Sequence, residues 1–199
     1  LQDWNAFYPR LVQAIRGEDT DTPIIVPSSS YAFVDWLPYL HPLDDPYAVY
    51  DVHPYVPWQY VFQVHDPVHF PSELDLDYDD QDDVLDTAWL RQSLAPARQY
   101  QAEHGPVAAM EFGASRWAAD IGAYLTAMME VLEEAGMNHA VWAWYPRGFA
   151  TDGDQFDIRR SQDFDDHRDS EDTKALLALR SFWQKNTLRP SGVVFVSGQ

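Results

Sequence analysis

An acidic residue ends a short apolar segment of this sequence, and its position there needs an explanation. The segment PVAAMEFGAS covers residues 106–115, and its apolar run is typical of a buried β-strand that finishes with Glu111. An ionised carboxylate is costly to bury unless it is paired, hydrogen-bonded or reacting. Glu111 is therefore either a reactive carboxylate or a structural one that caps a backbone amide or pairs with Arg116.

Two ring side chains, His53 and Tyr55, are spaced to act on such a carboxylate. They lie two residues apart in the sequence VHPY, so on an extended segment they point to the same side. A tyrosine hydroxyl that donates to a carboxylate favours its ionised form, and a carboxylate nucleophile must be ionised and oriented. The alternative is a polar pair at a strand end with a structural role.

Tryptophans indicate a second kind of chemistry, the stacking of aromatic rings on the apolar faces of sugars. Trp142 and Trp144 alternate within HAVWAWYP, residues 139–146, so they are predicted to share one face at the end of a strand. The chain contains 8 Trp and 11 Tyr, which is a generous supply of such rings. Because a single tryptophan is more often a core or interface residue, only the placement at a strand end favours sugar binding.

Metal binding is a third possibility, and two stretches raise it. His65 and His69 are four residues apart, but a proline between them argues against the helix that would aim both rings at one ion. Asp75, Asp77 and Asp79 alternate as in a calcium-binding loop, yet aspartates replace the required glycine and the final glutamate. We therefore expect a solvated acidic loop and no metal site. No glycine-rich phosphate loop and no Gly-x-Ser-x-Gly motif occurs in the sequence.

The elements that must position these residues alternate between helices and strands. Such alternation favours parallel βαβ units, in which chemistry gathers beyond the carboxyl ends of the strands. Four strands of this kind do not close a barrel. A long, acidic and irregular segment over 63–83 interrupts the series. Helices are predicted over 4–16, 86–103 with a kink at Pro96, 121–132 and 172–185, and strands within 22–30, 48–53, 106–111 and 139–146.

The composition limits the class of partner. With 199 residues and 46% hydrophobic content, the chain can bury a sizeable core as one domain or a large part of one. It has 32 acidic and 13 basic residues, and the net charge of −19 opposes binding to nucleic acid or to an anionic membrane surface. Cysteine is absent, which excludes disulfides, thiolate nucleophiles and cysteine-based metal sites.

Four collinear segments of the chain resemble glycoside hydrolase family 5, whose catalytic domains are cellulase-like (β/α)8 barrels. The resemblance implies an α/β fold that forms the C-terminal half of the barrel, strands 5 to 8 with their helices. Residues 1–199 would then be a partial catalytic domain without its N-terminal half. The similar segments are YDVHPYVPWQYVFQ for the sixth strand, DTAWLRQSLAPARQYQAEHGPVAAMEFGASRWA for the seventh strand and its preceding helix, EEAGMNHAVWAWYP for the eighth strand, and TKALLALRSFWQKN for the closing helix.

The same resemblance implies roles for the candidate residues. Glu111 takes the place of the nucleophile of a retaining glycosidase, which cleaves β-linked glucan or mannan through a covalent glycosyl-enzyme intermediate. His53 and Tyr55 become its hydrogen-bonding surroundings, and Trp142 the platform under the sugar at the point of cleavage. The other tryptophans expected to contact substrate are Trp144, Trp58 and Trp117.

One part of the family pattern is missing. The acid/base glutamate of the family follows an asparagine, and no Asn-Glu pair occurs in this sequence. We expect this glutamate upstream of Leu1, a fragment that is inactive alone, and a complete protein that is an extracellular or periplasmic polysaccharide hydrolase without a cofactor. Two alternatives stay open. One is a barrel that binds carbohydrate without cutting it, and the other is a metal-dependent hydrolase that uses His53, His65 and His69.

Overall fold

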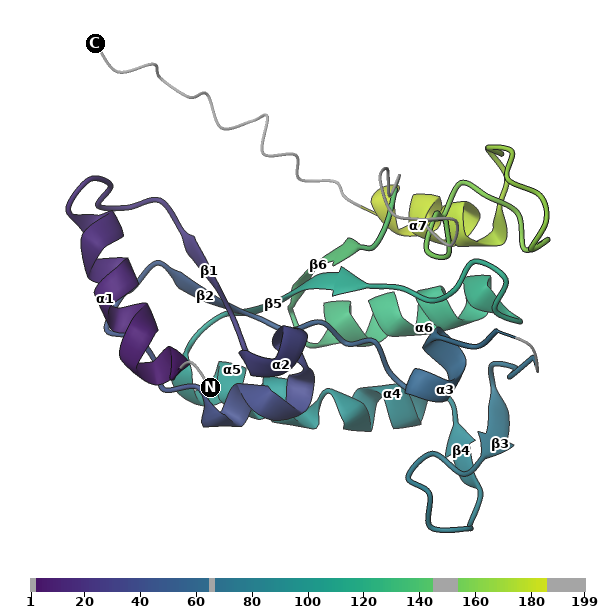
Figure 1. Ribbon diagram of the computed structural model, residues 1–199, viewed down its shortest axis with the longest axis horizontal. Helices are drawn as coiled ribbons and strands as arrows, with labels where there is room; N and C mark the ends of the chain where they lie inside the picture. Colours follow the sequence, from purple (N-terminus) through teal and green to yellow (C-terminus); the bar gives the residue numbers. More distant parts are fainter. Residues whose placement is uncertain (1–2, 65–66, 145–153, 186–199) are drawn as a thin grey trace.

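A computed structural model describes residues 3–64, 67–144 and 154–185 (Figure 1). Each region predicted as a helix contains a helix and each region predicted as a strand contains a strand, and the described residues add three short helices and a two-stranded hairpin. The helices are α1 (Trp4–Arg16), α2 (Ser29–Ala32), the 3-10 helix η1 (Val34–Tyr39), α3 (Trp58–Val61), α4 (Thr87–Ser93), α5 (Ala95–His104), α6 (Ile121–Glu134) and α7 (Lys174–Trp183). The strands are β1 (Ile24–Pro27), β2 (Ala48–Asp51), β3 (Ser72–Leu74), β4 (Asp83–Leu85), β5 (Val107–Phe112) and β6 (Asn138–Val141).

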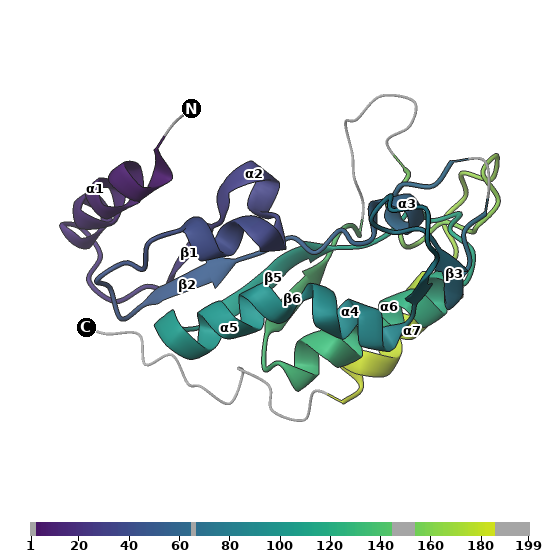
Figure 2. The same cartoon turned by 90° about the horizontal axis from the view of Figure 1, so that it is seen from below.

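Four parallel strands form the sheet that carries the candidate residues. Their order is β1-β2-β5-β6, with Ile24 beside Ala48 and Tyr50 beside Val107. Figure 2 shows α4, α5 and α6 together on one side of this sheet. Because the strands are parallel, their carboxyl ends meet at one edge, where ligand sites of such folds form. The predicted α/β class and the four-stranded parallel sheet are confirmed.

The core lies between the sheet and the helices, with α6 at its centre. α6 packs against α4, β6 and α7, so most of its circumference is apolar and not just one stripe. Small residues of β5, among them Ala108 and Ala109, are fully covered and let the helices approach the sheet closely. The buried side chains of α6 are Ile121, Tyr124, Leu125, Ala127, Met128, Met129, Val131 and Leu132.

Side-chain caps fix where the helices begin. Asp3 accepts a hydrogen bond from the backbone of Asn5, and Asp86 accepts one from Trp89, so each satisfies a free N–H of the first turn. The kinked helix predicted over 86–103 is two helices that meet at Leu94, because a proline at the start of α5 fits the first turn better than a helix interior.

None of the described helices is long and apolar enough to cross a membrane.

Two other predictions need correction. The segment 63–83 is not irregular throughout, because β3 pairs with β4 in an antiparallel hairpin with Ser72 beside Leu85. The strand predicted over 139–146 is shorter, since β6 ends at Val141. Residues 145–153 lie outside the described part of the chain.

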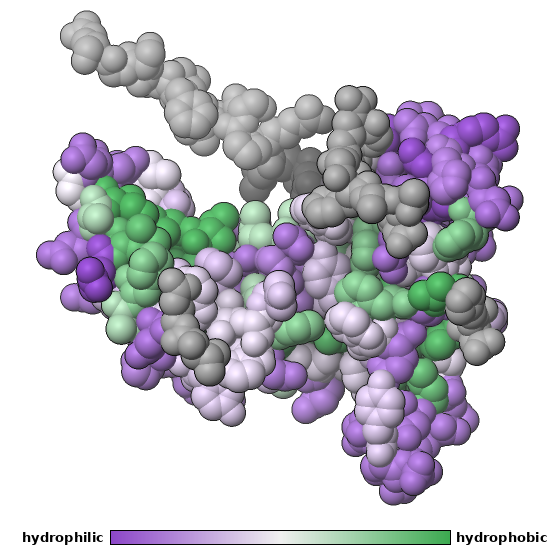
Figure 3. All heavy atoms as spheres, in the orientation of Figure 1, coloured by the Kyte–Doolittle hydropathy of each residue, from purple (hydrophilic) through white to green (hydrophobic). Residues whose placement is uncertain are grey.

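The outer edge of the sheet beside β1 is hydrophobic. Figure 3 shows this surface over α1 and β1, where Phe7, Leu11 and Ile25 are exposed. In the described chain β1 pairs with β2 on one side, and its other side has no strand. Such an edge leaves backbone donors and acceptors available for a further strand.

Candidate active site

Glu111 lies near the carboxyl end of β5, and its side chain is 33% exposed. The hydroxyl of Tyr55 donates to its Oε2 atom over 3.0 Å. Nδ1 of His53 is 3.5 Å from the same oxygen. The structure thus brings together the three residues predicted to form the reactive group, although Tyr55 and Glu111 are 56 positions apart in the chain.

Neighbouring rings hold Tyr55 in this position. Its ring lies 5.9 Å from that of Phe62 and 5.7 Å from that of Phe156, measured between centroids. Burial raises the pKa of Tyr55, and the charge of Glu111 raises it further. The hydroxyl therefore stays protonated, so it donates to Glu111 and favours the ionised carboxylate.

His53 lies between two carboxylates. Its Nε2 atom is 2.9 Å from Oδ2 of Asp51, on the side away from Glu111. Burial lowers the pKa of His53, but the hydrogen bond and charge of Asp51, together with the charge of Glu111, outweigh burial and raise it. The backbone N–H of His53 donates to the carbonyl of Ala32 over 2.7 Å, which fixes the chain where it leaves β2.

Trp142 follows β6 at the same edge of the sheet, and 37% of its surface is exposed. Its backbone N–H donates to the carbonyl of Phe112 over 2.8 Å, and its peptide bond to Ala143 is cis. Gly113 makes a closer approach, because a Cβ atom at this position would lie 2.3 Å from the Trp142 carbonyl oxygen. The sequence Glu-Phe-Gly therefore has a physical reason: its glycine lets the strand of Glu111 and the chain of Trp142 meet.

Trp144 lies in a different setting from Trp142. The prediction that both rings share one strand face is wrong, because β6 ends at Val141, before either ring. The ring of Trp144 is 6.4 Å from that of Trp183 at the end of α7. Its carbonyl accepts a hydrogen bond from Nε of Arg159 over 2.8 Å.

The two remaining tryptophan candidates differ in exposure. Trp58 is 57% exposed, and its ring lies 4.0 Å from that of Phe62, which in turn contacts Tyr55. A series of ring contacts thus connects Trp58 with the tyrosine that holds the carboxylate. Trp117 is half-buried, and its indole N–H donates to the carbonyl of Gln63 over 2.7 Å.

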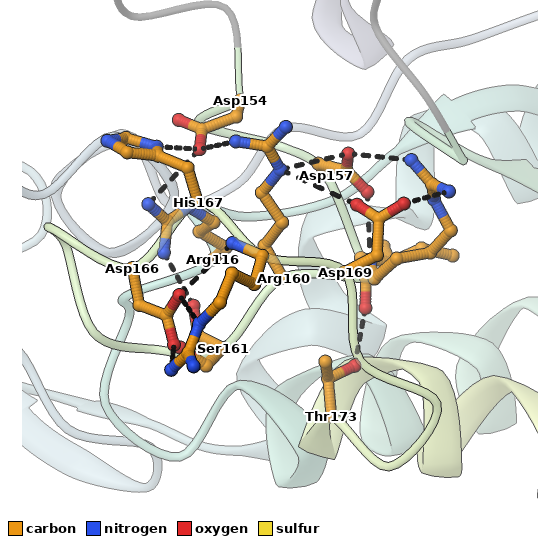
Figure 4. Close-up of polar contacts among 12 residues, drawn as sticks. Arg116, Asp154, Asp157, Arg160, Ser161, Asp166, His167, Asp169 and Thr173 are labelled. Atoms are coloured by element: carbon orange, nitrogen blue, oxygen red, sulfur yellow. Dashed lines mark hydrogen bonds and ion pairs between the residues drawn. The ribbon is translucent and has the colours of Figure 1, made fainter.

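Arg116 is not the partner of Glu111, so that structural interpretation of the carboxylate is wrong. Its side chain is 1% exposed, and its Nη2 atom lies 3.2 Å from Oδ2 of Asp154. It also donates to backbone carbonyls of the loop that follows Asp154 (Figure 4). These acceptors are the carbonyl oxygens of Ser161, Asp163 and Phe164, at 2.6, 2.5 and 2.8 Å.

Asp154 is the centre of the polar cluster in Figure 4. Besides Arg116 it binds Nδ1 of His167 at 2.6 Å and Nη1 of Arg160 at 2.7 Å. Burial raises the pKa of Asp154, but the hydrogen bonds to His167 and Arg160 and the positive charges of Arg116 and His167 outweigh burial and lower it. The carboxylate is therefore held ionised among three basic side chains.

This cluster supports the candidate site through the chain next to Asp154. The N–H of Ala143 donates to the carbonyl of Phe156 over 2.9 Å, so the loop runs beside Trp142. The ring of Phe156 packs edge-on against Tyr55. One loop thus contacts both the tyrosine bound to Glu111 and the backbone next to the exposed tryptophan.

The acidic loop contains the one group of three possible metal ligands found among the described residues. Asp75, Asp77 and Asp79 each offer an oxygen within 4.8 Å of the others. However, both oxygens of Asp75 already accept backbone hydrogen bonds within the loop, from residues 78, 79 and 80. These bonds explain the fold of the loop without an ion.

The alternative of a metal site built from His53, His65 and His69 draws no support from the two of these histidines that the structure describes. His69 is 64% exposed, and its Nδ1 atom lies 2.8 Å from Oδ2 of Asp120. His53 uses its two nitrogens on Asp51 and Glu111. His65 lies outside the described residues.

The structure adds Asp51, Phe156 and the inward position of Arg116 to the predicted set. Asp51 had a signal in the sequence, because residues 51, 53 and 55 alternate and therefore lie on one side of an extended segment. The sequence carried no signal for the positions of Phe156 and Arg116. Their contacts join distant parts of the chain, so no local pattern of residues predicts them.

The sequence comparison shows the family of the chain. Residues 1–148 match the family model described as Cellulase (glycosyl hydrolase family 5). This match covers more than half of the chain, so the chain belongs to glycosyl hydrolase family 5. The family implies a (β/α)8 barrel, and the described residues supply four parallel strands of one. A search of curated protein sequences gave no match.

Solved structures share the fold at low sequence identity. The cellulose synthase subunit Z (CcsZ) from Clostridioides difficile has a TM-score of 0.66 and 18% identity, covering 88% of this chain and 55% of that one. Thermotoga maritima Cel5A in complex with mannotriose has a TM-score of 0.64 and 19% identity, and the match covers 88% of this chain and 54% of that one. A hyperthermophilic endo-β-1,4-glucanase in complex with substrate has a TM-score of 0.61 and 18% identity, and the match covers 87% of this chain and 53% of that one. This chain therefore spans about half the length of these proteins.

Proposed function

We propose that this chain is part of a retaining glycosidase that hydrolyses β-linked glucan or mannan, with Glu111 as the nucleophile. The observation that carries the proposal is the hydrogen bond of 3.0 Å from Tyr55 to Glu111 at the carboxyl edge of a parallel sheet. Family membership supports it. The substrate class draws on two structural neighbours, an endo-β-1,4-glucanase with bound substrate and a Cel5A with bound mannotriose.

The reaction would proceed in two displacements on one sugar carbon. An oxygen of Glu111 attacks the anomeric carbon and forms an ester, while the bond to the leaving oxygen breaks and an acid protonates that oxygen. Water, deprotonated by the same acid/base group, then attacks the anomeric carbon and releases Glu111 as a carboxylate. Tyr55 would orient Glu111 for the first step, and the exposed ring of Trp142 would lie under the sugar.

The acid/base group must come from elsewhere in the barrel. We propose that β1, β2, β5 and β6 are strands 5 to 8, and that the acid/base glutamate belongs to the half of the fold that this chain does not span. That glutamate would stand about 5 to 5.5 Å from Glu111 in a retaining enzyme. The hydrophobic edge beside β1 supports this placement, because a further strand would cover it.

The remaining proposals concern sugar contacts and location. Trp58 and Trp144 are exposed, so their rings are available to sugars beyond the cleavage point, whereas the half-buried Trp117 offers less of its surface. A polysaccharide substrate lies outside the cell, and we propose an extracellular or periplasmic location for the complete protein.

A trapping experiment tests the nucleophile without needing the acid. The full natural polypeptide that carries these residues is incubated with the dinitrophenyl glycoside of 2-deoxy-2-fluorocellobiose, whose leaving group departs without protonation. The fluorine slows hydrolysis of the ester, so a covalent adduct accumulates and peptide mass spectrometry locates it. We expect the adduct on Glu111, none in Glu111→Gln, and labelling slower by about tenfold or more in Tyr55→Phe, which loses a hydrogen bond to a charged group.

A matched control is Glu134→Gln, which removes an exposed glutamate of α6 that pairs with Arg91. This variant should label at the wild-type rate. An adduct that persists in Glu111→Gln would overturn the nucleophile assignment. Retention on a cellulose column with no adduct and no hydrolysis would favour the binding protein. Hydrolysis of the polysaccharide that forms no adduct and stops with a chelator would favour the metal-dependent hydrolase.

A further inference from the structure

We propose that Asp51 is a positioning residue that sets the orientation and the proton of His53 beside Glu111. The proposal rests on the proposed role of Glu111 and adds a residue that touches neither the sugar nor the reacting atoms. Its basis is a continuous row of three side chains. Oδ2 of Asp51 lies 2.9 Å from Nε2 of His53, and Nδ1 of His53 lies 3.5 Å from Oε2 of Glu111.

Asp51 is itself held rigidly. It is the last residue of β2 and is 4% exposed. Its Oδ1 atom accepts a hydrogen bond of 2.9 Å from the backbone N–H of Met110 in β5, so both carboxylate oxygens have partners. The register of β5 against β6 shifts between Ala109 and Phe112. The carboxylate thus satisfies a backbone donor at the place where the regular ladder of β5 is interrupted.

The two nitrogens of an imidazole are not equivalent in such a row. A neutral ring carries one proton, and its other nitrogen presents a lone pair. Asp51 is the nearer of the two carboxylates, so a neutral His53 ring carries its proton on Nε2 and donates it to Asp51. His53 donates to Glu111 as well only when both ring nitrogens are protonated and the ring is a cation. Asp51 thereby excludes the neutral form whose single proton is on Nδ1.

The charged neighbours of His53 agree with this assignment. Asp51 faces it from β2, Glu111 from β5, and the Tyr55 hydroxyl from the segment that follows β2. From α1, Tyr8 lies within the electrostatic reach of Asp51, since burial and then the charge of Asp51 raise its pKa. The two carboxylates favour the protonated imidazole.

The consequence for Glu111 follows from charge. A positive imidazole beside the carboxylate keeps it ionised, and it stabilises the negative charge that returns to Glu111 when the glycosyl ester is hydrolysed. Without Asp51 the ring can rotate and lose its proton. His53 would then no longer present a defined hydrogen-bond donor to Glu111.

The first test uses the unmodified protein. In the natural polypeptide labelled with nitrogen-15 at histidine, the ring nitrogen shifts report which atoms of His53 carry protons. We expect Nε2 to be protonated at neutral pH. A neutral ring with its proton on Nδ1 would overturn the proposal, and this result does not depend on whether any variant folds.

The second test compares two variants of buried aspartates. Asp51→Asn removes the charge next to His53, and Asp45→Asn is the control. Asp45 has a side chain that is 5% exposed, against 6% for Asp51, and it pairs with Arg16 before the other end of β2. We expect Asp51→Asn to move the titration midpoint of His53 to lower pH and to slow fluorosugar labelling by at least about tenfold, and Asp45→Asn to do neither.

The outcomes separate this proposal from the proposed function. If Asp51→Asn leaves both the His53 midpoint and its protonated nitrogen unchanged, Asp51 has no positioning role, whatever the labelling shows. If the wild-type protein is not labelled at Glu111 but the midpoint moves as expected, the proposed function fails while the pairing of Asp51 with His53 stands.

Discussion

Replacing Arg116 with methionine should strongly destabilise the loop that supports the candidate site. The side chain is 1% exposed, makes an ion pair with Asp154 and donates to three backbone carbonyls. Methionine keeps much of the volume and removes every one of these bonds. The loop of residues 154–164 would lose the charge around which it is arranged.

The magnitude follows from these contacts. A hydrogen bond from a charged donor contributes about 1.5 to 3 kcal/mol, so three at the lower value give about 4.5 kcal/mol. Breaking a buried ion pair costs about 3 to 5 kcal/mol when the remaining charge is left alone. Asp154 retains Arg160 and His167, so its charge is still paired in the variant. We therefore expect Arg116→Met to lower the free energy of unfolding by about 4 kcal/mol, or the melting temperature by roughly 8 to 16 °C.

Urea denaturation followed by tryptophan fluorescence measures this change. The control is Arg168→Met, a few residues beyond this loop, because Arg168 also pairs with an aspartate, Asp166, but its side chain is 88% exposed. An exposed pair of this kind contributes little, so the control should unfold with the wild type. If Arg116→Met changes stability no more than Arg168→Met does, the buried guanidinium does not organise the loop and the reasoning is refuted.

Two further predictions concern the same region. Gly113→Ala places a Cβ atom 2.3 Å from the carbonyl oxygen of Trp142, so the backbone must move. We expect the free energy of unfolding in urea to fall by about 1 to 3 kcal/mol and fluorosugar labelling to become slower. Wild-type values in both assays would contradict the contact. The lowered pKa of Asp154 means that its ionised form stabilises the folded state above the unfolded-state pKa, and that this contribution is lost as the pH falls through the lowered value. The stability difference between wild type and Asp154→Asn should therefore be full at neutral pH and shrink below about pH 4. A difference that grows toward acid pH would show that the sign is wrong.

The parallel sheet could be predicted because its signals are local. Short apolar runs of β-branched and small residues lie between helices with a buried stripe, and this order favours βαβ units. The meeting of Glu111 with His53 and Tyr55 could also be predicted, since residues at the carboxyl ends of neighbouring parallel strands come to one edge. The prediction that Trp142 and Trp144 share one face relied on strand alternation, and it failed because β6 already ends at Val141.

Other features left no local signal. The hairpin of β3 and β4 consists of two strands of three residues, too short and too polar for a period of two to stand out. The cluster around Asp154 depends on pairs between Arg116 and residues about 40 positions later, and charge in the sequence does not say which partner each arginine takes. Asp51 was visible in the spacing of the segment around His53, but its bond to Met110 in β5 depends on the register of two strands.

The close approach at Gly113 has a consequence for engineering. What meets the glycine is the carbonyl of Trp142, a backbone group, and the residue as a whole keeps 37% of its surface exposed. Because this contact involves the backbone of Trp142, we expect that its side chain can be exchanged for another without disturbing the strand that carries Glu111. Substrate preference and bond cleavage would then be traits that mutation can alter separately, provided that position 113 stays glycine.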